Sequence, residues 1–153
     1  LEENMSTSGS EQAAHDIVAA MADAWNAHDA HAFAAIFAWN SDFTNVFGMS
    51  THGREEIERF HRPLFETMFK ESRLAAIQTQ VRQIRPDVAA VDLHWEMSGA
   101  RDPSGNQWPS RRGLMNLLIT REQEGWAIMV MHNMELPSDG VADAQAQLQA
   151  RHQ

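Results

Sequence analysis

The apolar segment "IMVMHNMEL" (residues 128–136) contains a His-Asn pair whose side chains could act on a small molecule. A histidine can move a proton near neutral pH, and an asparagine amide can donate to a carbonyl oxygen or accept from a hydroxyl. Neighbouring side chains of a strand point to opposite faces, so His132 and Asn133 cannot both face one pocket. Only one of the two is therefore a candidate for a site inside the protein.

A second histidine, His61, lies in the segment "GREEIERFHRPLFETMFK" on one helical stripe with Ile57, Phe60 and Leu64. This apolar stripe predicts that the imidazole points inward. The sequence leaves three interpretations open: a buried neutral ring bonded to a nearby carbonyl, a general acid, base or ligand hydrogen-bonder, and a metal ligand. Pro63 lies inside the same pattern and should kink or divide the helix.

His94, Glu96 and His132 have a strand spacing that could form a His/carboxylate metal set. Such spacing is common by chance, and the chain shows no Ser-His-Asp order, phosphate loop or nucleotide fingerprint. The chain also has no cysteine, which excludes disulfides, thiolate metal sites and a Cys nucleophile. We therefore expect neither a metal site nor a cofactor.

The length of 153 residues fits one domain with a sizeable core. There are 12 Lys and Arg residues against 21 Asp and Glu residues, and the net charge of −9 repels nucleic-acid phosphates and anionic membranes. No apolar stretch approaches the roughly 18 residues that span a bilayer, and no basic region followed by a hydrophobic one begins the chain. We expect a cytoplasmic protein with no nucleic-acid or membrane partner.

The spacing of apolar residues predicts helices first and strands later. A capping-box pattern opens a helix over residues 9–28, Asp29 caps a second helix in "AHAFAAIFAW", and a short strand "DFTNVFG" precedes the helix of His61. Four strands follow from about residue 74, separated by "RPD", "ARDPSGNQWPS" and "EQEG". This order indicates an α+β fold with helices on one face of a curved antiparallel sheet.

We expect three segments along the chain. Residues 1–8 are a disordered or tag-derived N-terminus, residues 9–137 form a single domain, and residues 138–153 are a polar tail or a marginal helix.

The motifs "AWNAHDAHAFAAIFA", "DF", "GREEI", "PDVAAV" and "EGWAI" follow one another in this chain. Their order over residues 11–136 resembles the SnoaL-like family of the nuclear-transport-factor and ketosteroid-isomerase superfamily, in the group related to enediyne-biosynthesis accessory proteins. The resemblance implies a cone in which a bent sheet wraps a long helix around an apolar pocket. It also implies a homodimer through the outer sheet face, and the strands "RGLMNLLIT" and "WAIMVM" are apolar on both faces.

The steroid isomerases of this superfamily use an Asp base with an oxyanion hole made of a Tyr and a protonated Asp. A comparison with them aligns these catalytic positions with Met21, Asn45 and Asn116. All three catalytic groups are replaced, and the chain has no tyrosine. An asparagine does not abstract a proton at neutral pH. Steroid isomerisation by that mechanism is therefore not expected.

The same comparison sets the strand parity. It implies that the pocket-facing positions are Val91, Leu93, Trp95 and Met97, then Arg112, Leu114, Asn116 and Leu118, then Met129, Met131 and Asn133. It turns His132 outward. An inward Arg112 suggests a carboxylate or other anion on the ligand, with a position at the mouth or a pair with Glu66 or Glu96 as the alternative.

These inferences predict a SnoaL-like protein that binds a small molecule. It would be an isomerase, cyclase or lyase that acts on an apolar oxygenated metabolite, with a non-catalytic ligand-binding or assembly domain as the alternative. The predicted catalytic residues are His61, Asn45 and Asn116. The predicted ligand-binding residues are Asn133, Arg112, Met21, Trp25, Trp95, Met129 and Met131.

Overall fold

The computed structural model describes residues 2–137 and 139–152, with the backbone alone over residues 2–8. Its elements follow one another as α1 (Glu2–Asn26), α2 (Ala30–Ala35), β1 (Phe37–Thr44), β2 (Ser50–His52), α3 (Arg54–Glu66), β3 (Arg73–Arg85), β4 (Val88–Ser98), β5 (Arg111–Glu122), β6 (Gly125–Glu135) and α4 (Gly140–Arg151). The α+β class predicted from the sequence is confirmed.

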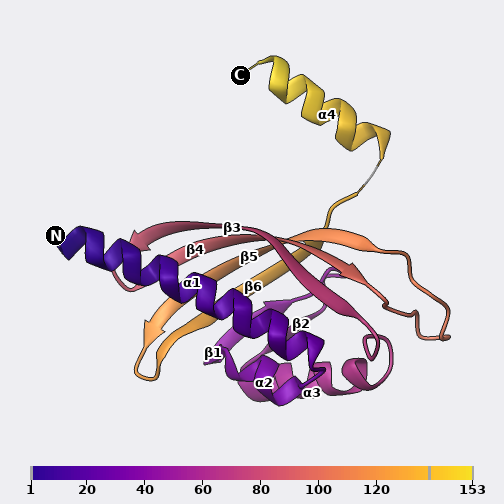
Figure 1. Ribbon diagram of the computed structural model, residues 1–153, viewed down its shortest axis with the longest axis horizontal. Coiled ribbons are helices and arrows are strands. Elements are labelled where there is room, and N and C mark those ends of the chain that lie inside the picture. Colours follow the sequence, from indigo (N-terminus) through magenta and orange to yellow (C-terminus); the bar gives the residue numbers. More distant parts are fainter. Residues whose placement is uncertain (1, 138, 153) are drawn as a thin grey trace.

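The fold is built on one curved sheet of six strands, whose order is β2-β1-β6-β5-β4-β3. β1 and β6 are parallel, and the other neighbours are antiparallel. Figure 1 shows α1 lying across the sheet, with α2 and α3 together at one end of it. α1 contacts β3, β4 and β6, so the inner face of the sheet and this helix enclose the core.

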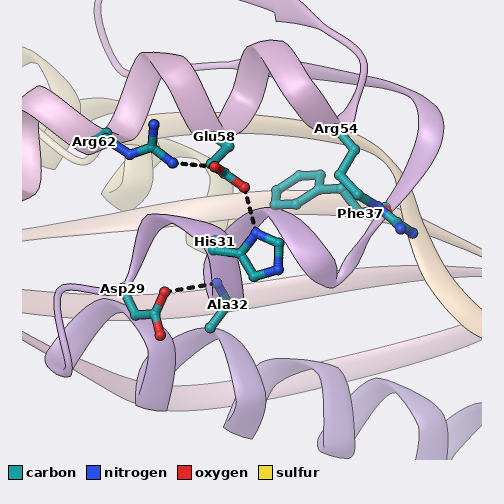
Figure 2. Close-up of polar contacts among 7 residues, drawn as sticks. All are labelled: Asp29, His31, Ala32, Phe37, Arg54, Glu58 and Arg62. Carbon is teal, nitrogen blue, oxygen red and sulfur yellow. Dashed lines mark hydrogen bonds and ion pairs between the residues drawn. The ribbon is translucent and has the colours of Figure 1, made fainter.

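The helices α2 and α3 are tied to each other by polar contacts (Figure 2). Asp29 caps α2 by accepting from the backbone N–H of Ala32 at 3.0 Å. His31 Nδ1 donates to Glu58 Oε1 of α3 at 2.7 Å, and Arg62 also pairs with Glu58. These donors hold the pKa of the Glu58 carboxyl below its usual value, with the His31 hydrogen bond as the largest cause.

The inner face of β4 is the predicted one, because Val91, Leu93, Trp95 and Met97 are buried. The predicted face of β5 is wrong. Its buried positions are Gly113, Met115, Leu117 and Ile119, and Arg112 and Asn116 are exposed. The strand is apolar on both faces, so alternation of polarity leaves its facing undetermined.

β6 carries a bulge that moves one predicted pocket residue. Leu118 pairs with Val130 and Ile119 pairs with Ile128, so Met129 is an extra residue between the two pairs. Met129 is therefore only half-buried, whereas Ile128 and Met131 are fully buried. Beyond the bulge, His132 is exposed on the outer face and Asn133 faces inward.

Several element boundaries differ from those predicted. α1 begins at Glu2 rather than at residue 9, and β1 begins at Phe37, inside the segment that we expected to continue as a helix. α3 contains Pro63 without being divided. The C-terminal segment forms α4, which is capped by Asp139 and buries none of its residues. Figure 1 shows α4 projecting from the domain.

Gly113 is the β5 residue that faces the large ring of Trp95. A Cβ atom at Gly113 would lie 2.1 Å from the Trp95 ring and 2.5 Å from the Met134 carbonyl oxygen. We expect Gly113→Ala to lower the free energy of unfolding by about 1–3 kcal/mol or more, because the ring must leave its position.

Urea unfolding measures this loss, with Gly9→Ala in α1 as the control. Nothing lies within 4 Å of a Cβ at Gly9, so this variant should be neutral or more stable by up to about 1 kcal/mol. Equal stabilities of the Gly113→Ala variant and the wild type would contradict the described β5 facing.

Candidate ligand-binding pocket

A pocket of about 310 Å³ opens at the end of the sheet beside α3. Its walls come from α1, α3 and the segment after α3, the β1–β2 turn, β4, and the β4–β5 loop with the first residue of β5. The lining residues are mostly apolar: Trp25, Asn45, Val46, Phe47, Met49, Phe60, Leu64, Met68, Phe69, Met97, Trp108 and Arg111.

The β1–β2 turn forms one rim of this pocket. Asn45 Oδ1 accepts from the backbone N–H groups of Phe47 and Met49, both at 2.9 Å, and Gly48 takes a positive φ of 76°. Phe47 stacks on Trp108 of the opposite loop with ring centroids 6.1 Å apart. Asn45 therefore lines the pocket, as predicted, but its carbonyl oxygen is used to hold the turn.

Arg111 brings a buried cation to the pocket wall. Its side chain is 7% exposed, and its guanidinium carbon lies 3.5 Å from the centroid of the Trp108 ring. Nη2 contacts Met97 Sδ at 3.3 Å, and Nε lies 3.7 Å from Glu135 Oε1 with no hydrogen-bond partner among the described residues. Burial lowers the pKa of Arg111 and the Glu135 carboxylate opposes this, but a guanidinium stays charged.

The sequence predicted an arginine at the pocket, but it named Arg112, and the arginine that lines the pocket is Arg111. Arg112 is exposed on the opposite face of β5 because Gly113 has to face Trp95, and Arg111 shares the face of Gly113. The signal that could have indicated the facing of β5 was Gly113, because a glycine is required opposite the buried Trp95. Asn116 is also on the outer face, where its Nδ2 donates to Asp92 Oδ1 at 2.6 Å. Neither Arg112 nor Asn116 lines the pocket.

His61 lies behind the pocket wall instead of inside the pocket. The residue is 2% exposed, and its Nδ1 donates to the Ile57 carbonyl at 2.8 Å. The ring centroids of Phe33, Phe43 and Phe60 lie 4.4, 4.8 and 5.2 Å from the centroid of the imidazole. Burial lowers the pKa of His61 to about 4, so the ring is neutral at physiological pH. Of the three interpretations, the structure supports the buried neutral ring.

The other predicted binding residues divide between the pocket and the core. Trp25 lines the pocket, and its Nε1 donates to Ser72 Oγ at 2.9 Å. Trp95 is buried, and its Nε1 donates to Asn133 Oδ1 at 2.7 Å. Met21 and Met131 are fully buried. A role of Asn133 in binding stays a prediction, because its amide oxygen is already used by Trp95.

Within the described part of the chain, no three His, Asp or Glu side chains are placed to hold a metal ion. His94, Glu96 and His132 belong to the outer side of the sheet. Over the same residues, no helix combines the length and the apolar character needed to cross a bilayer.

The buried histidine predicts a specific pH dependence of stability. An unfolded chain protonates His61 near the ordinary pKa of 6.5, whereas the folded protein resists protonation down to about 4. The folded state is therefore favoured fully above pH 6.5 and loses this advantage as the pH falls towards 4. We expect the wild type to lose about 2 kcal/mol relative to His61→Phe between pH 7.5 and 5.

Urea unfolding of both proteins across this range measures the difference. Titrating groups that the two proteins share cancel in the comparison. A difference that stays constant with pH would mean that the His61 imidazole titrates alike in the folded and unfolded chains.

Comparisons with known proteins place this geometry in a family. Similar structures include an uncharacterised protein with a cystatin-like fold from Caulobacter vibrioides, at 25% identity and a TM-score of 0.81, with 88% of this chain and 94% of that chain covered. A domain of unknown function with a cystatin-like fold from Nostoc punctiforme has 24% identity and a TM-score of 0.74, with 94% of this chain and 95% of that chain covered.

A nuclear transport factor 2-like protein from Salmonella enterica has 16% identity and a TM-score of 0.76, covering 88% and 96%, and shares the fold. No curated protein matches the sequence. The sequence model of the SnoaL-like domain matches residues 18–140, which is most of the described fold. The chain therefore belongs to the SnoaL-like domain family.

Proposed function

We propose that this SnoaL-like protein binds a small, mainly apolar molecule in the pocket between α3 and the β1–β2 turn. One observation carries the proposal: among the described residues that line this apolar pocket, Arg111 is the only ionisable side chain. Small-molecule sites commonly combine apolar walls with a few polar groups that orient the ligand.

The pocket walls suit a ligand with flexible or aromatic parts. Met49, Met68 and Met97 are unbranched and polarisable, so they adapt to ligands of different shape. Phe47 is 63% exposed and Met49 is 53% exposed at the rim. Large apolar side chains that are open to water next to a pocket favour the entry of an apolar molecule, which removes their surface from water.

Binding is better supported than the predicted isomerase, cyclase or lyase chemistry. A general base needs a pKa near the working pH and a position within hydrogen-bond reach of the substrate. Arg111 stays protonated, and His61 donates to the Ile57 carbonyl behind the wall. Asn116 lies on the other face of the sheet. The pocket thus favours the alternative drawn from the sequence, a ligand-binding domain without acid–base catalysis.

We also propose that the outer face of the sheet joins two copies of the chain, as the resemblance implied. Leu114, Leu118 and Val130 are only half-buried there, and Met134 is 42% exposed. These side chains lie on the neighbouring strands β5 and β6. A second copy would cover them and leave the pocket entrance to the ligand.

The uncharged fluorescent probe N-phenyl-1-naphthylamine tests the pocket. We expect saturable binding to the wild type and a loss of about tenfold or more in affinity for Leu64→Trp, because the larger ring fills the pocket. Glu66→Trp adds the same ring at an exposed position of α3 outside the pocket lining and should bind as the wild type does. Equal binding by all three proteins, or no binding by the wild type, would reject the proposed site.

Light scattering at micromolar concentration tests the dimer. We expect a dimeric mass for the wild type and a monomeric mass for Leu118→Glu, because a buried unpaired carboxylate at the interface opposes association. Ala19→Glu on the exposed side of α1 should remain dimeric. A monomeric wild type would overturn the proposed dimer and would leave the proposed ligand pocket unaffected.

A further inference from the structure

We propose that the ligand of this pocket is an apolar monocarboxylate whose carboxylate is bound by Arg111. The inference rests on the proposed function and names the chemical class of the ligand. It follows from the hydrogen-bond state of Arg111, from the way its guanidinium is held, and from the charges around it.

The hydrogen-bonding capacity of Arg111 is largely unused by the protein. A guanidinium has five N–H donors and no acceptor. The only hydrogen bond described for this side chain runs from Nη2 to a thioether sulfur, Met97 Sδ, which is a weak acceptor. Nε has no acceptor within hydrogen-bond distance, and only 7% of the side chain is exposed. A cation in this state is stabilised by a ligand that supplies oxygen acceptors to its Nη groups.

The protein also holds the guanidinium in one orientation. The guanidinium carbon lies 3.5 Å from the centroid of the Trp108 ring and 5.9 Å from that of Trp95, and Phe47 stacks on Trp108. A guanidinium held over an indole face can still donate from its edge, and at Arg111 the N–H groups left for a ligand are those of Nη1 and Nη2, whose one described bond is to a weak acceptor. A carboxylate matches such an edge with both of its oxygens. The contact with Trp108 therefore preorganises Arg111 for a carboxylate.

The surroundings of Arg111 favour a single negative charge. Arg111 also borders a second groove, which is lined by Arg73 and Arg112 with Glu96 as its acid. This positive region draws anions towards Arg111 on a chain whose net charge is −9. Glu135 at 3.7 Å from Nε already offsets part of the Arg111 charge, so a monoanion is better matched there than a dianion.

Competition against bound N-phenyl-1-naphthylamine tests the ligand class with two probes of equal chain length, octanoate and 1-octanol. An apolar pocket without an available cation prefers the alcohol, because a carboxylate loses more hydration on entry. We expect the wild type to show the reverse, with octanoate competing about tenfold more strongly than 1-octanol at pH 7.5.

Variants at two arginines of β5 assign the preference. Arg111→Met should abolish the preference for octanoate, measured as the ratio of the two competition constants on that variant, and Arg111→Lys should keep part of the preference, because a lysine retains the charge but not the planar fork. Arg121→Met is the control, since Arg121 is exposed at the far end of the same strand and should leave the preference unchanged.

The outcomes separate this inference from the proposed function. If the fluorescent probe binds but 1-octanol competes as well as octanoate, or if Arg111→Met keeps the wild-type preference, the carboxylate inference is overturned and the apolar pocket stands. If octyl phosphate competes more strongly than octanoate, the choice of a carboxylate is wrong. If the fluorescent probe does not bind the wild type, the proposed function itself fails.

Discussion

The packing of Trp95 against Gly113 determines which residues of β5 face inward. The two residues are partners in the β4–β5 ladder, and a side chain at position 113 would overlap the indole ring. Because side chains alternate along a strand, this one contact turns Arg111, Met115 and Leu117 inward. It also turns Arg112 and Asn116 outward. The chemistry of the pocket therefore depends on a contact between a glycine and a tryptophan that do not line the pocket.

The buried charge that results is held by aromatic packing rather than by a close ion pair. Arg111 lies against Trp108, and Trp108 stacks on Phe47 of the β1–β2 turn. That turn is fixed in its own right by the Asn45 side chain, which accepts from two backbone N–H groups. The position of the cation and the shape of the pocket rim are thus coupled, because both depend on the same stack of rings.

The order of the helices and of the four long strands β3 to β6 could be predicted from the sequence, since period and turn residues act locally. The short strand β2 and the parallel pairing of β1 with β6 were not predicted. The inner face of β4 could be predicted too, because Asp92 and His94 alternate with apolar residues. In β5 polar and apolar residues do not alternate in this way, and the sequence of β6 does not indicate the bulge at Met129. The facing of these two strands depends on contacts between strands, which is why the predicted site had Arg112 in place of Arg111.

The inward stripe of α3 shows how a polar residue in the core differs from one at a site. Along this stripe Ile57, His61 and Phe65 are buried, and the adjoining Phe60 and Leu64 line the pocket. The helical stripe contained members of both sets, so it left the role of His61 undecided. His61 is satisfied by the Ile57 carbonyl of its own helix and is neutral, so burial leaves no unmet demand for a partner. Arg111 keeps its charge although only 7% of its side chain is exposed, and its Nε has no hydrogen-bond partner among the described residues. This lack of acceptors distinguishes Arg111 from His61 and is the reason that we infer a ligand for it.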